Sequence, residues 1–457
     1  MEQPSLPHWD LSNVYPGLES EAFKKDVQRL RTHLDDLDEY LATHEIARGA
    51  AYPRDIDALA ATIAGYLDRM NGIMRLGRTL SAYVHGFVST DSYNTQARRV
   101  ASELEPLLVR VERQEVLFRG WIGTIAQDPE ALAAVLELEG PAQDHRFYLA
   151  ETAEQSQYLM GEAEESLAAE LSLSGARAWQ KLQGVVTSQL KVPFDAREDG
   201  HVESLPMAIL QNQRTDADED VRRRAYEAEL AAWEAVREPL AACLNGIKGA
   251  VQTLNVRRGR ADALHEALDQ ARIERETLEV MLAAMRGSFP AFRRYFRGKA
   301  RLLGKQSLAW WDLFAPLGSS DRRYDFDEAR AFILAQFVTF SDRLASFAER
   351  AFRDRWIDAE PRDGKRSGAF CMGLPGVEES RVLCNFDGSL DQVLTLAHEL
   401  GHAYHNECLA GKTMLQRRTP MTLAETASIF NETIVTDALL ARATGVEEKQ
   451  AILENFL

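Results

Sequence analysis

The spacing of apolar residues along the chain predicts a protein built mainly from amphipathic helices. From Glu19 to His44 an apolar residue recurs every three or four positions, as on one face of a helix. The same spacing runs from Ile56 to about Ile125 with an interruption near Ser89-Thr90-Asp91, which predicts two antiparallel helices joined by a turn. Further helical stretches are expected from Asp128, over Arg146–Leu190 with a break near Gly161 or Ser172–Gly175, from Asp216 towards Gln252, over Glu274–Leu303 and over Asp327–Trp356.

One segment of different character separates these helices. Residues Lys191–Gln213 contain prolines, a Glu198-Asp199-Gly200 turn and short β-favouring stretches, which together predict a small hairpin. We expect a domain boundary at this hairpin, between an N-terminal helical region of residues 1–190 and a second region of residues 191–457.

A second irregular segment precedes the most informative helix of the chain. Over Pro361–Ser389 the composition shifts to glycine, proline and two short strand-like stretches, Gly368–Gly373 and Arg381–Phe386. An S-x-x-Q capping box follows at Ser389, and apolar residues continue with helical spacing up to Gly411. The fold class expected is therefore mainly α, with a small β-sheet beside this helix.

The composition is that of a globular protein, and the charge narrows the classes of partner. Hydrophobic residues make up 45% of the chain and charged residues 27%. The net charge of -17 at pH 7 opposes binding to nucleic acid or to an anionic membrane surface. The first residues lack the features of a signal peptide, no apolar run is long enough to span a bilayer, and the cysteines form no C-x-x-C pair. We expect a cytoplasmic protein with free thiols that binds neither nucleic acid nor membranes, and the sequence specifies no oligomeric state.

The candidate chemistry lies in the helix after Ser389, in the sequence His398-Glu399-Leu400-Gly401-His402. This is the H-E-x-x-H pattern of zinc peptidases. Because the two histidines are four residues apart, they lie about 40° apart around the helix axis and about 6 Å along it, so both imidazoles can reach one metal ion. Glu399 points about 100° away from His398, which leaves it beside the metal as a base for water.

A catalytic zinc site usually has three protein ligands, so the chain has to supply one more. The segment Thr419–Glu432 is predicted to form a second helix with Glu425, Ser428 and Glu432 on one face. Thr422 and Glu425 also fit a capping box, which would make Glu425 a surface residue. However, Thr419 followed by Pro420 is typical of an N-cap and a first helical residue, which would start the helix one turn earlier. Glu425 would then not be needed to cap the helix. The spacing alone leaves both roles of Glu425 open.

Two further residues are expected near the metal without binding it. His405 shares the helix face of His398 but lies about 10.5 Å further along the axis, so we expect it to contact a ligand residue or the substrate. Glu432 is expected to accept a hydrogen bond from a ligand histidine. The longer metzincin pattern is excluded, because it requires glycine in place of His405 and histidine in place of Cys408.

These segments resemble the oligoendopeptidase F branch of the thimet-oligopeptidase-like zinc peptidases. The resemblance is carried first by His398–His405 and Leu423–Glu432. It extends to most of the chain through Lys365–Phe370, Val382–Phe386, Trp310–Leu313 and Trp9-Asp10-Leu11.

The resemblance implies one Zn²⁺ ion bound by His398, His402 and Glu425, with Glu399 as the general base. It also implies a multi-helix body with a deep channel that admits short oligopeptides and excludes folded proteins. The substrate backbone is then expected to pair in β fashion with the strand Arg381, Val382, Leu383, Cys384, Asn385 and Phe386, which agrees with the strand pattern of these residues.

The function expected is a zinc-dependent endopeptidase that cleaves internal bonds of short oligopeptides, with residues 191–457 as its catalytic region. Members of the family continue with helices whose tyrosine and histidine residues complete the site, so this region is expected to lack its C-terminal end. The alternatives are a zinc carboxypeptidase or dipeptidase, and an inactive fragment of such an enzyme.

Overall fold

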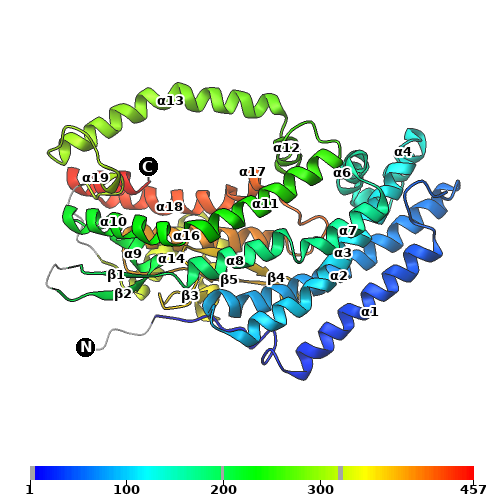
Figure 1. The fold of residues 1–457 in the computed structure, drawn as a ribbon, viewed down its shortest axis with the longest axis horizontal. Coiled ribbons are helices and arrows are strands. Elements are labelled where there is room, and N and C mark those ends of the chain that lie inside the picture. The colour runs from blue at the N-terminus through cyan, green and yellow to red at the C-terminus, as the bar shows by residue number, and fades with distance from the viewer. Residues whose placement is uncertain (1–5, 197–199, 318–322, 457) are drawn as a thin grey trace.

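The long helices expected in the first part of the chain are present in the computed structural model, which describes residues 6–196, 200–317 and 323–456 (Figure 1). Each begins after a polar residue whose side chain accepts a hydrogen bond from a backbone N–H of the first turn. These helices are α1 (Glu21–Thr43), α2 (Ile56–Thr90) and α3 (Thr95–Ile125), capped by Ser20, Asp55 and Asn94. Their apolar faces pack into one buried core.

The rest of the chain is also mostly helical, which confirms a mainly α fold. The later helices are α4 (Pro129–Glu137), α5 (Pro141–Asp144), α6 (Arg146–Gln155), α7 (Glu162–Ser172), α8 (Ala176–Ser188), α9 (Met207–Asn212), α10 (Glu219–Ala235), α11 (Arg237–Arg257), α12 (His265–Ala271), α13 (Arg275–Leu302), α14 (Phe326–Phe340), α15 (Asp342–Arg353), α16 (Leu390–Cys408), α17 (Met421–Ala424), α18 (Thr426–Arg442) and α19 (Val446–Phe456). Two stretches expected to be continuous are split where the backbone leaves the helical conformation, at Val236 and at Ser341.

Two small sheets interrupt the helices. The first pairs β1 (Lys191–Phe194) with β2 (Glu203–Pro206) in antiparallel fashion, which confirms the hairpin; Glu198 and Asp199 of its expected turn lie outside the described residues. The second sheet has the order β3-β5-β4. Its strands are β3 (Ile357–Asp358), β4 (Phe370–Leu374) and β5 (Glu379–Leu383), with β5 parallel to β3 and antiparallel to β4.

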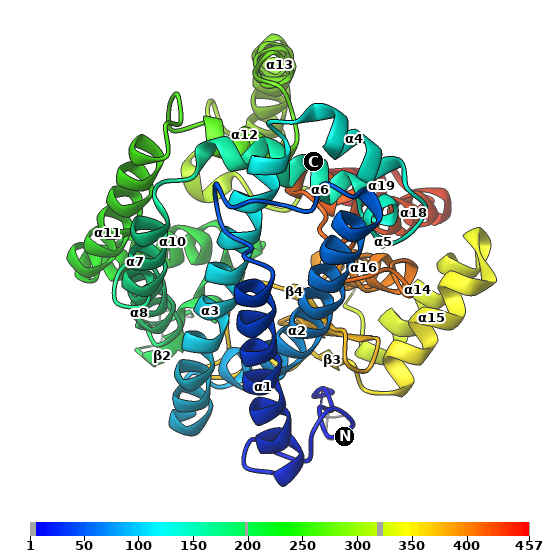
Figure 2. The same cartoon turned by 90° about the vertical axis from the view of Figure 1, so that its right-hand side faces the viewer.

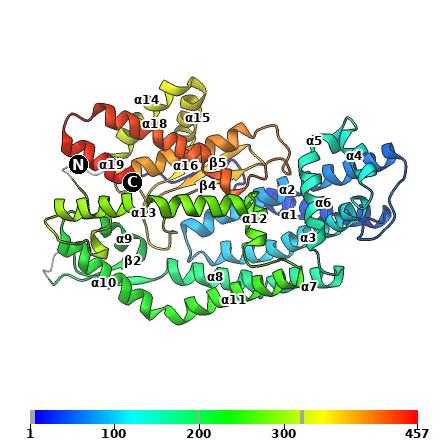
Figure 3. The same ribbon diagram turned by 90° about the horizontal axis from the view of Figure 1, so that it is seen from above.

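The helices form two groups that extend from the end built by α1 to α6. Figure 3 shows α7, α8, α10 and α11 on one side, and α14, α15, α16 and α18 on the other. Between them, Figure 2 shows β4 near α2 and α16, and both of these helices contact β4. The long helix α13 bridges the molecule and is exposed along most of its length (Figure 1).

The expected boundary at residue 190 stays a prediction. The core of the first helices also contains residues far beyond this boundary, namely Leu374, Leu383, Met414 and Leu415. A second core is formed mainly by α14, α15, α16, α18 and the sheet. Within the described ranges, none of the helices combines the length and the apolar character needed to cross a bilayer.

Candidate metal centre

Helix α16 carries the H-E-x-x-H sequence in its interior. The Ser389 side chain accepts a hydrogen bond from the backbone N–H of Gln392, as expected for the N-cap. The return bond of the predicted capping box is replaced, because the backbone N–H of Ser389 donates to Asp387 instead. The helix ends at Cys408, before Gly411, whose φ of 80° is a turn conformation that favours glycine.

The segment that carries Glu425 is two helices and not the single one predicted. α17 ends at Ala424, α18 begins at Thr426, and Glu425 lies between them with φ -87° and ψ 1°. Pro420 precedes the first of these helices and is not its first helical residue. The carboxylate of Glu425 makes no capping hydrogen bond to the helix that follows it. The break directs this side chain towards α16.

Gly401 allows this segment to come close to α16. A Cβ atom at Gly401 would lie 2.6 Å from both the carbonyl oxygen of Ala427 and the Cα atom of Ser428. Both are backbone atoms at the start of α18, so no side-chain rearrangement could make room. Gly401 therefore sets the distance between the two helices that carry the candidate ligands.

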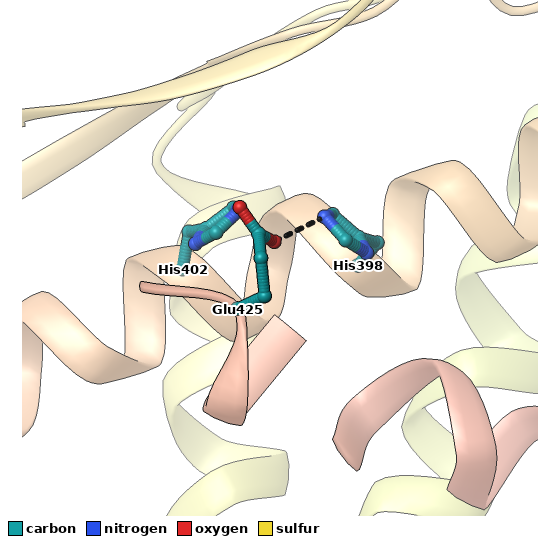
Figure 4. A group of neighbouring side chains, drawn as sticks. All are labelled: His398, His402 and Glu425. Atoms are coloured by element: carbon teal, nitrogen blue, oxygen red, sulfur yellow. Dashed lines mark ion pairs between the residues drawn. The ribbon is translucent and has the colours of Figure 1, made fainter. Parts of the chain in front are cut away.

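Three potential metal-binding atoms meet in the space between α16 and Glu425. His398 and His402 project from one side of α16 towards the Glu425 carboxylate (Figure 4). The Oε2 atom of Glu425 lies 3.1 Å from Nε2 of His398 and 3.2 Å from Nε2 of His402. Within the described part of the chain, these are the residues whose donor atoms are grouped closely enough to hold a metal ion.

The donor set fits zinc. Two imidazole nitrogens and one carboxylate oxygen are a common ligand set for catalytic zinc, which keeps a fourth position open. Ligand atoms at about 2.0 to 2.1 Å from a tetrahedral ion stand about 3.3 to 3.4 Å apart, close to the separations between Glu425 and the two histidines.

Hydrogen bonds hold two of these residues in place. Oε2 of Glu432 lies 3.2 Å from Nδ1 of His398, which leaves Nε2 of that ring facing Glu425. The hydroxyl of Ser428 donates to Oε2 of Glu425 at 2.7 Å. The sequence placed Ser428 beside Glu425 on the helix, but the residue type alone gave no sign of this contact.

Glu399 is the buried carboxylate of the site. Its side chain lies at 6% exposure, and Oε2 has no hydrogen-bond partner among the described residues. Burial raises the pKa of Glu399 to about 7, because the charged form loses hydration; His398 opposes this shift and Glu425 adds to it.

The pKa values of the three candidate ligands are shifted by burial and by the groups around them. The hydrogen bond to Glu432 raises the pKa of His398, whereas burial lowers the pKa of His402. Burial alone would raise the pKa of Glu425, but the Ser428 hydrogen bond and the two histidines outweigh it and hold that pKa below its usual value.

A pocket of about 690 Å³ opens onto this site. It is lined by α16, by the start of β4 and by the segment before α18, with Ala369, Phe370, Cys371, Glu399, His402 and His405 among its residues. His405 thus faces the same pocket but lies outside the donor group. Its contact with a ligand or with substrate stays a prediction.

The expectation that substrate pairs along Arg381–Phe386 does not fit the sheet. β5 is the central strand, with β3 on one edge and β4 on the other. The backbone N–H groups of Cys384 and Phe386 continue the pairing by donating to Asp358 and Ala359. The side chains of the segment are buried, apart from Asn385. The strand β3 has only two residues, too few for a sequence pattern to reveal, and it pairs with the side of β5 that faces away from β4.

Comparisons with known proteins agree with the motif and the fold. Residues 213–457 match the model of the family described as Peptidase family M3, and residues 125–191 match the model described as Oligopeptidase F. The chromosomal oligoendopeptidase F of Lactococcus lactis subsp. cremoris is 28% identical over 279 residues, which are 59% of this chain and 45% of that protein. Oligopeptidase PepF of Bacillus subtilis (strain 168) is 23% identical over 456 residues, which are 98% of this chain and 65% of that protein.

The overall fold is also similar to solved structures. Oligoendopeptidase-F from Enterococcus faecium superposes with a TM-score of 0.66 at 18% identity, covering 95% of this chain and 70% of that one. A solved structure of PZ peptidase A with an inhibitor gives a TM-score of 0.68 at 12% identity, covering 94% of this chain and 71% of that one. The chain spans 45% of the length of the Lactococcus lactis oligoendopeptidase F and 65% of the length of Bacillus subtilis PepF.

Proposed function

The chain belongs to peptidase family M3, and from this premise we propose that it is a zinc-dependent endopeptidase that hydrolyses internal bonds of short peptides. His398, His402 and Glu425 would hold the zinc ion, and Glu399 would be the general base. The relatives whose names describe oligopeptidases and oligoendopeptidases support this substrate class.

One observation carries the proposal. Among the described residues, Oε2 of Glu399 is the buried carboxylate oxygen that lacks a hydrogen-bond partner, and it lies on the helix that presents two ligand nitrogens to the same pocket. A buried acceptor without a donor is costly, because it has lost its hydration without replacement. A water molecule in the pocket would satisfy it.

The reaction follows from this arrangement. When bound, zinc would polarise the scissile carbonyl and make water more acidic. Glu399 would accept a proton from the attacking water on its free oxygen and deliver it to the nitrogen of the leaving amine. Glu432 would keep Nδ1 of His398 engaged, so that Nε2 faces the metal position. Burial of Glu399 supports this role, because a poorly hydrated carboxylate is a stronger base.

The substrate backbone would pair with β4 in place of β5. The N–H of Val382 donates to the carbonyl oxygen of Trp356, directly before β3, so the N–H and C=O groups of Arg381 and Leu383 point to β4. By the same alternation, the N–H and C=O groups of Cys371 and Gly373 point away from the sheet. An extended peptide beside this edge would lie in the pocket that contains Glu399 and His402.

Metal content tests the ligand set. The purified chain and Glu425→Ala would be loaded with zinc, freed of excess metal and measured by elemental analysis. We expect about one zinc per chain in the parent and a large loss in Glu425→Ala. Glu238→Ala is the matched control, because this glutamate is 83% exposed on α11 and should leave the zinc content unchanged. Equal zinc in all three proteins would remove Glu425 from the site.

Hydrolysis tests the base and the type of cleavage. An internally quenched peptide blocked at both ends should be cleaved by the zinc-loaded chain, and Glu399→Gln should cut the rate by about 10² to 10⁴ while zinc stays bound. Cleavage of unblocked peptides only would favour a carboxypeptidase or dipeptidase. A zinc-loaded chain that cleaves neither peptide would contradict the proposed activity for this length of chain.

A further inference from the structure

Arg78 occupies a position that the proposed reaction does not use. It lies on α2 and lines the pocket of the metal centre as well as an adjoining pocket of about 420 Å³ that follows β4 away from the metal. Its side chain is exposed to this space. Both pockets are bordered by the edge of β4 that we propose pairs with substrate.

The neighbouring arginines are paired, whereas Arg78 is not. Arg417 donates to both carboxylate oxygens of Glu378, at 3.2 and 2.9 Å, and Arg418 forms an ion pair with Glu115. In the described parts of the chain, no acceptor lies within hydrogen-bonding or ion-pair distance of the Arg78 guanidinium. The wall formed by these three arginines therefore carries one positive charge without a counter-ion.

No carboxylate of the adjoining pocket is left to neutralise it. Each glutamate that lines this pocket already has its own cation: Glu378 pairs with Arg417, Glu379 with Arg381 at 2.9 Å, and Glu407 with Arg350 at 2.8 Å. An unpaired guanidinium in a polar pocket is poised to bind an anion, because its fork of N–H donors matches a carboxylate in a bidentate geometry.

We propose that Arg78 binds a carboxylate group of the peptide substrate. The inference rests on the proposed function, and it narrows the substrates to peptides that carry such a group in the part of the chain that lies along β4. The carboxylate can be the free α-carboxylate of a short peptide or an acidic side chain. In a protein with a net charge of -17, an anionic group is attracted to a site only where a local positive charge is left free.

Calorimetric titration of peptides tests this directly. The background is zinc-loaded Glu399→Gln, in which bound peptide is not turned over. The probes have one length: a neutral peptide with a free C-terminus, the same peptide with a C-terminal amide, and amidated peptides with one glutamate at successive positions. Arg78→Gln and Arg78→Lys are compared with Arg99→Gln, an arginine that is 64% exposed on α3 and borders neither pocket.

We expect Arg78→Gln to weaken the binding of the carboxylate-bearing peptide by about 10- to 100-fold, which is the contribution of one charge-assisted hydrogen bond. The affinity for the neutral amide should stay unchanged. Arg78→Lys should give an intermediate loss, because it keeps the charge without the fork. A loss confined to the free-acid peptide identifies the α-carboxylate, and a loss confined to one glutamate position identifies a side chain. Arg99→Gln should match the parent.

Unchanged affinity for every peptide in Arg78→Gln, or an equal loss for the neutral amide, would overturn the proposal. Failure of the proposed function is a different result, because then the parent with Glu399 intact cleaves no peptide. With Glu399 intact, Arg78→Gln should lose more kcat/KM for the carboxylate-bearing peptide than for the neutral amide. Thermal unfolding of Arg78→Gln should match the parent, since the side chain has no partner to lose.

Discussion

Replacing Gly401 with alanine places a methyl group between the two segments that hold the candidate metal ligands. The new Cβ atom would lie 2.6 Å from the carbonyl oxygen of Ala427 and from the Cα atom of Ser428, where ordinary contacts are about 3.5 Å or more. The start of α18 would have to move by about 1 Å. Glu425 lies directly before α18, so its carboxylate would move with it.

The magnitudes can be worked out for stability and for metal binding separately. Overpacking of this kind costs about 1 to 3 kcal/mol, and alanine is favoured over glycine inside a helix by about 1 kcal/mol. The free energy of unfolding of the metal-free Gly401→Ala protein should therefore fall by no more than about 2 kcal/mol. Zinc affinity should fall by about 10- to 100-fold, because ligand positions are tolerated only within about 0.2 Å.

Urea unfolding of the metal-free protein and competition with a coloured zinc chelator measure the two effects. Gly249→Ala is the matched control, since Gly249 lies inside α11 and an added Cβ meets no atom within 4 Å. It should stabilise the protein by up to about 1 kcal/mol and leave zinc binding unchanged. If Gly401→Ala binds zinc as tightly as the parent, the close approach does not set the ligand geometry.

Three other substitutions test the remaining contacts. Glu432→Gln should weaken zinc binding by about 10- to 100-fold in chelator competition without changing the metal-free melting temperature, because it weakens the acceptor for Nδ1 of His398. Burial raises the pKa of Asp358, but Arg362 and Lys365 outweigh it, so the folded pKa is lowered. The stability that this carboxylate adds is present above about pH 4 and is lost as the pH falls through the lowered value. Asp358→Asn should thus cost about 3 to 5 kcal/mol in urea unfolding at pH 7, and the difference from the parent should shrink below pH 4. Arg381→Met should lower the free energy of unfolding by a similar amount yet leave KM for a blocked peptide unchanged; a raised KM would restore its expected role in substrate binding.

The helices were predictable where local signals agree. α1 and α2 start and end within about two residues of the expected positions, and α3 ends at the expected Ile125, because the apolar spacing agrees with the polar caps of these helices. The breaks at Val236 and Ser341 were not expected, since apolar residues with helical spacing continue on both sides of each. Packing of the flanking helices against different neighbours decides such breaks, and sequence spacing does not record it.

The arrangement of the candidate ligands was also predictable only in part. The relation between His398 and His402 follows from helix geometry alone, so the pattern predicts it at once. The relation of both to Glu425 depends on the helix break at Glu425 and on the contact at Gly401, which join segments that are separate in the sequence. The sequence therefore left two roles open for Glu425. In the folded structure Thr422 lies inside α17 and not at an N-cap, and the Glu425 carboxylate lies beside both histidines.

Arg381 and Glu399 show why residue type and strand pattern cannot identify every site residue. Both are charged, both are buried, and both were expected in the site. Arg381 donates to the carbonyl oxygen of Asp10, to Asn13 and to Glu379, so its charge is fully engaged in fastening the N-terminal segment to the sheet. Glu399 has an oxygen without a partner. A buried ionisable side chain whose polar atoms all have partners stabilises the fold and offers little to a substrate. One with an unpartnered oxygen can accept a hydrogen bond from a water molecule or a reactant. The partners that distinguish the two cases lie about 370 positions away in the chain for Arg381, so only the folded structure can assign them.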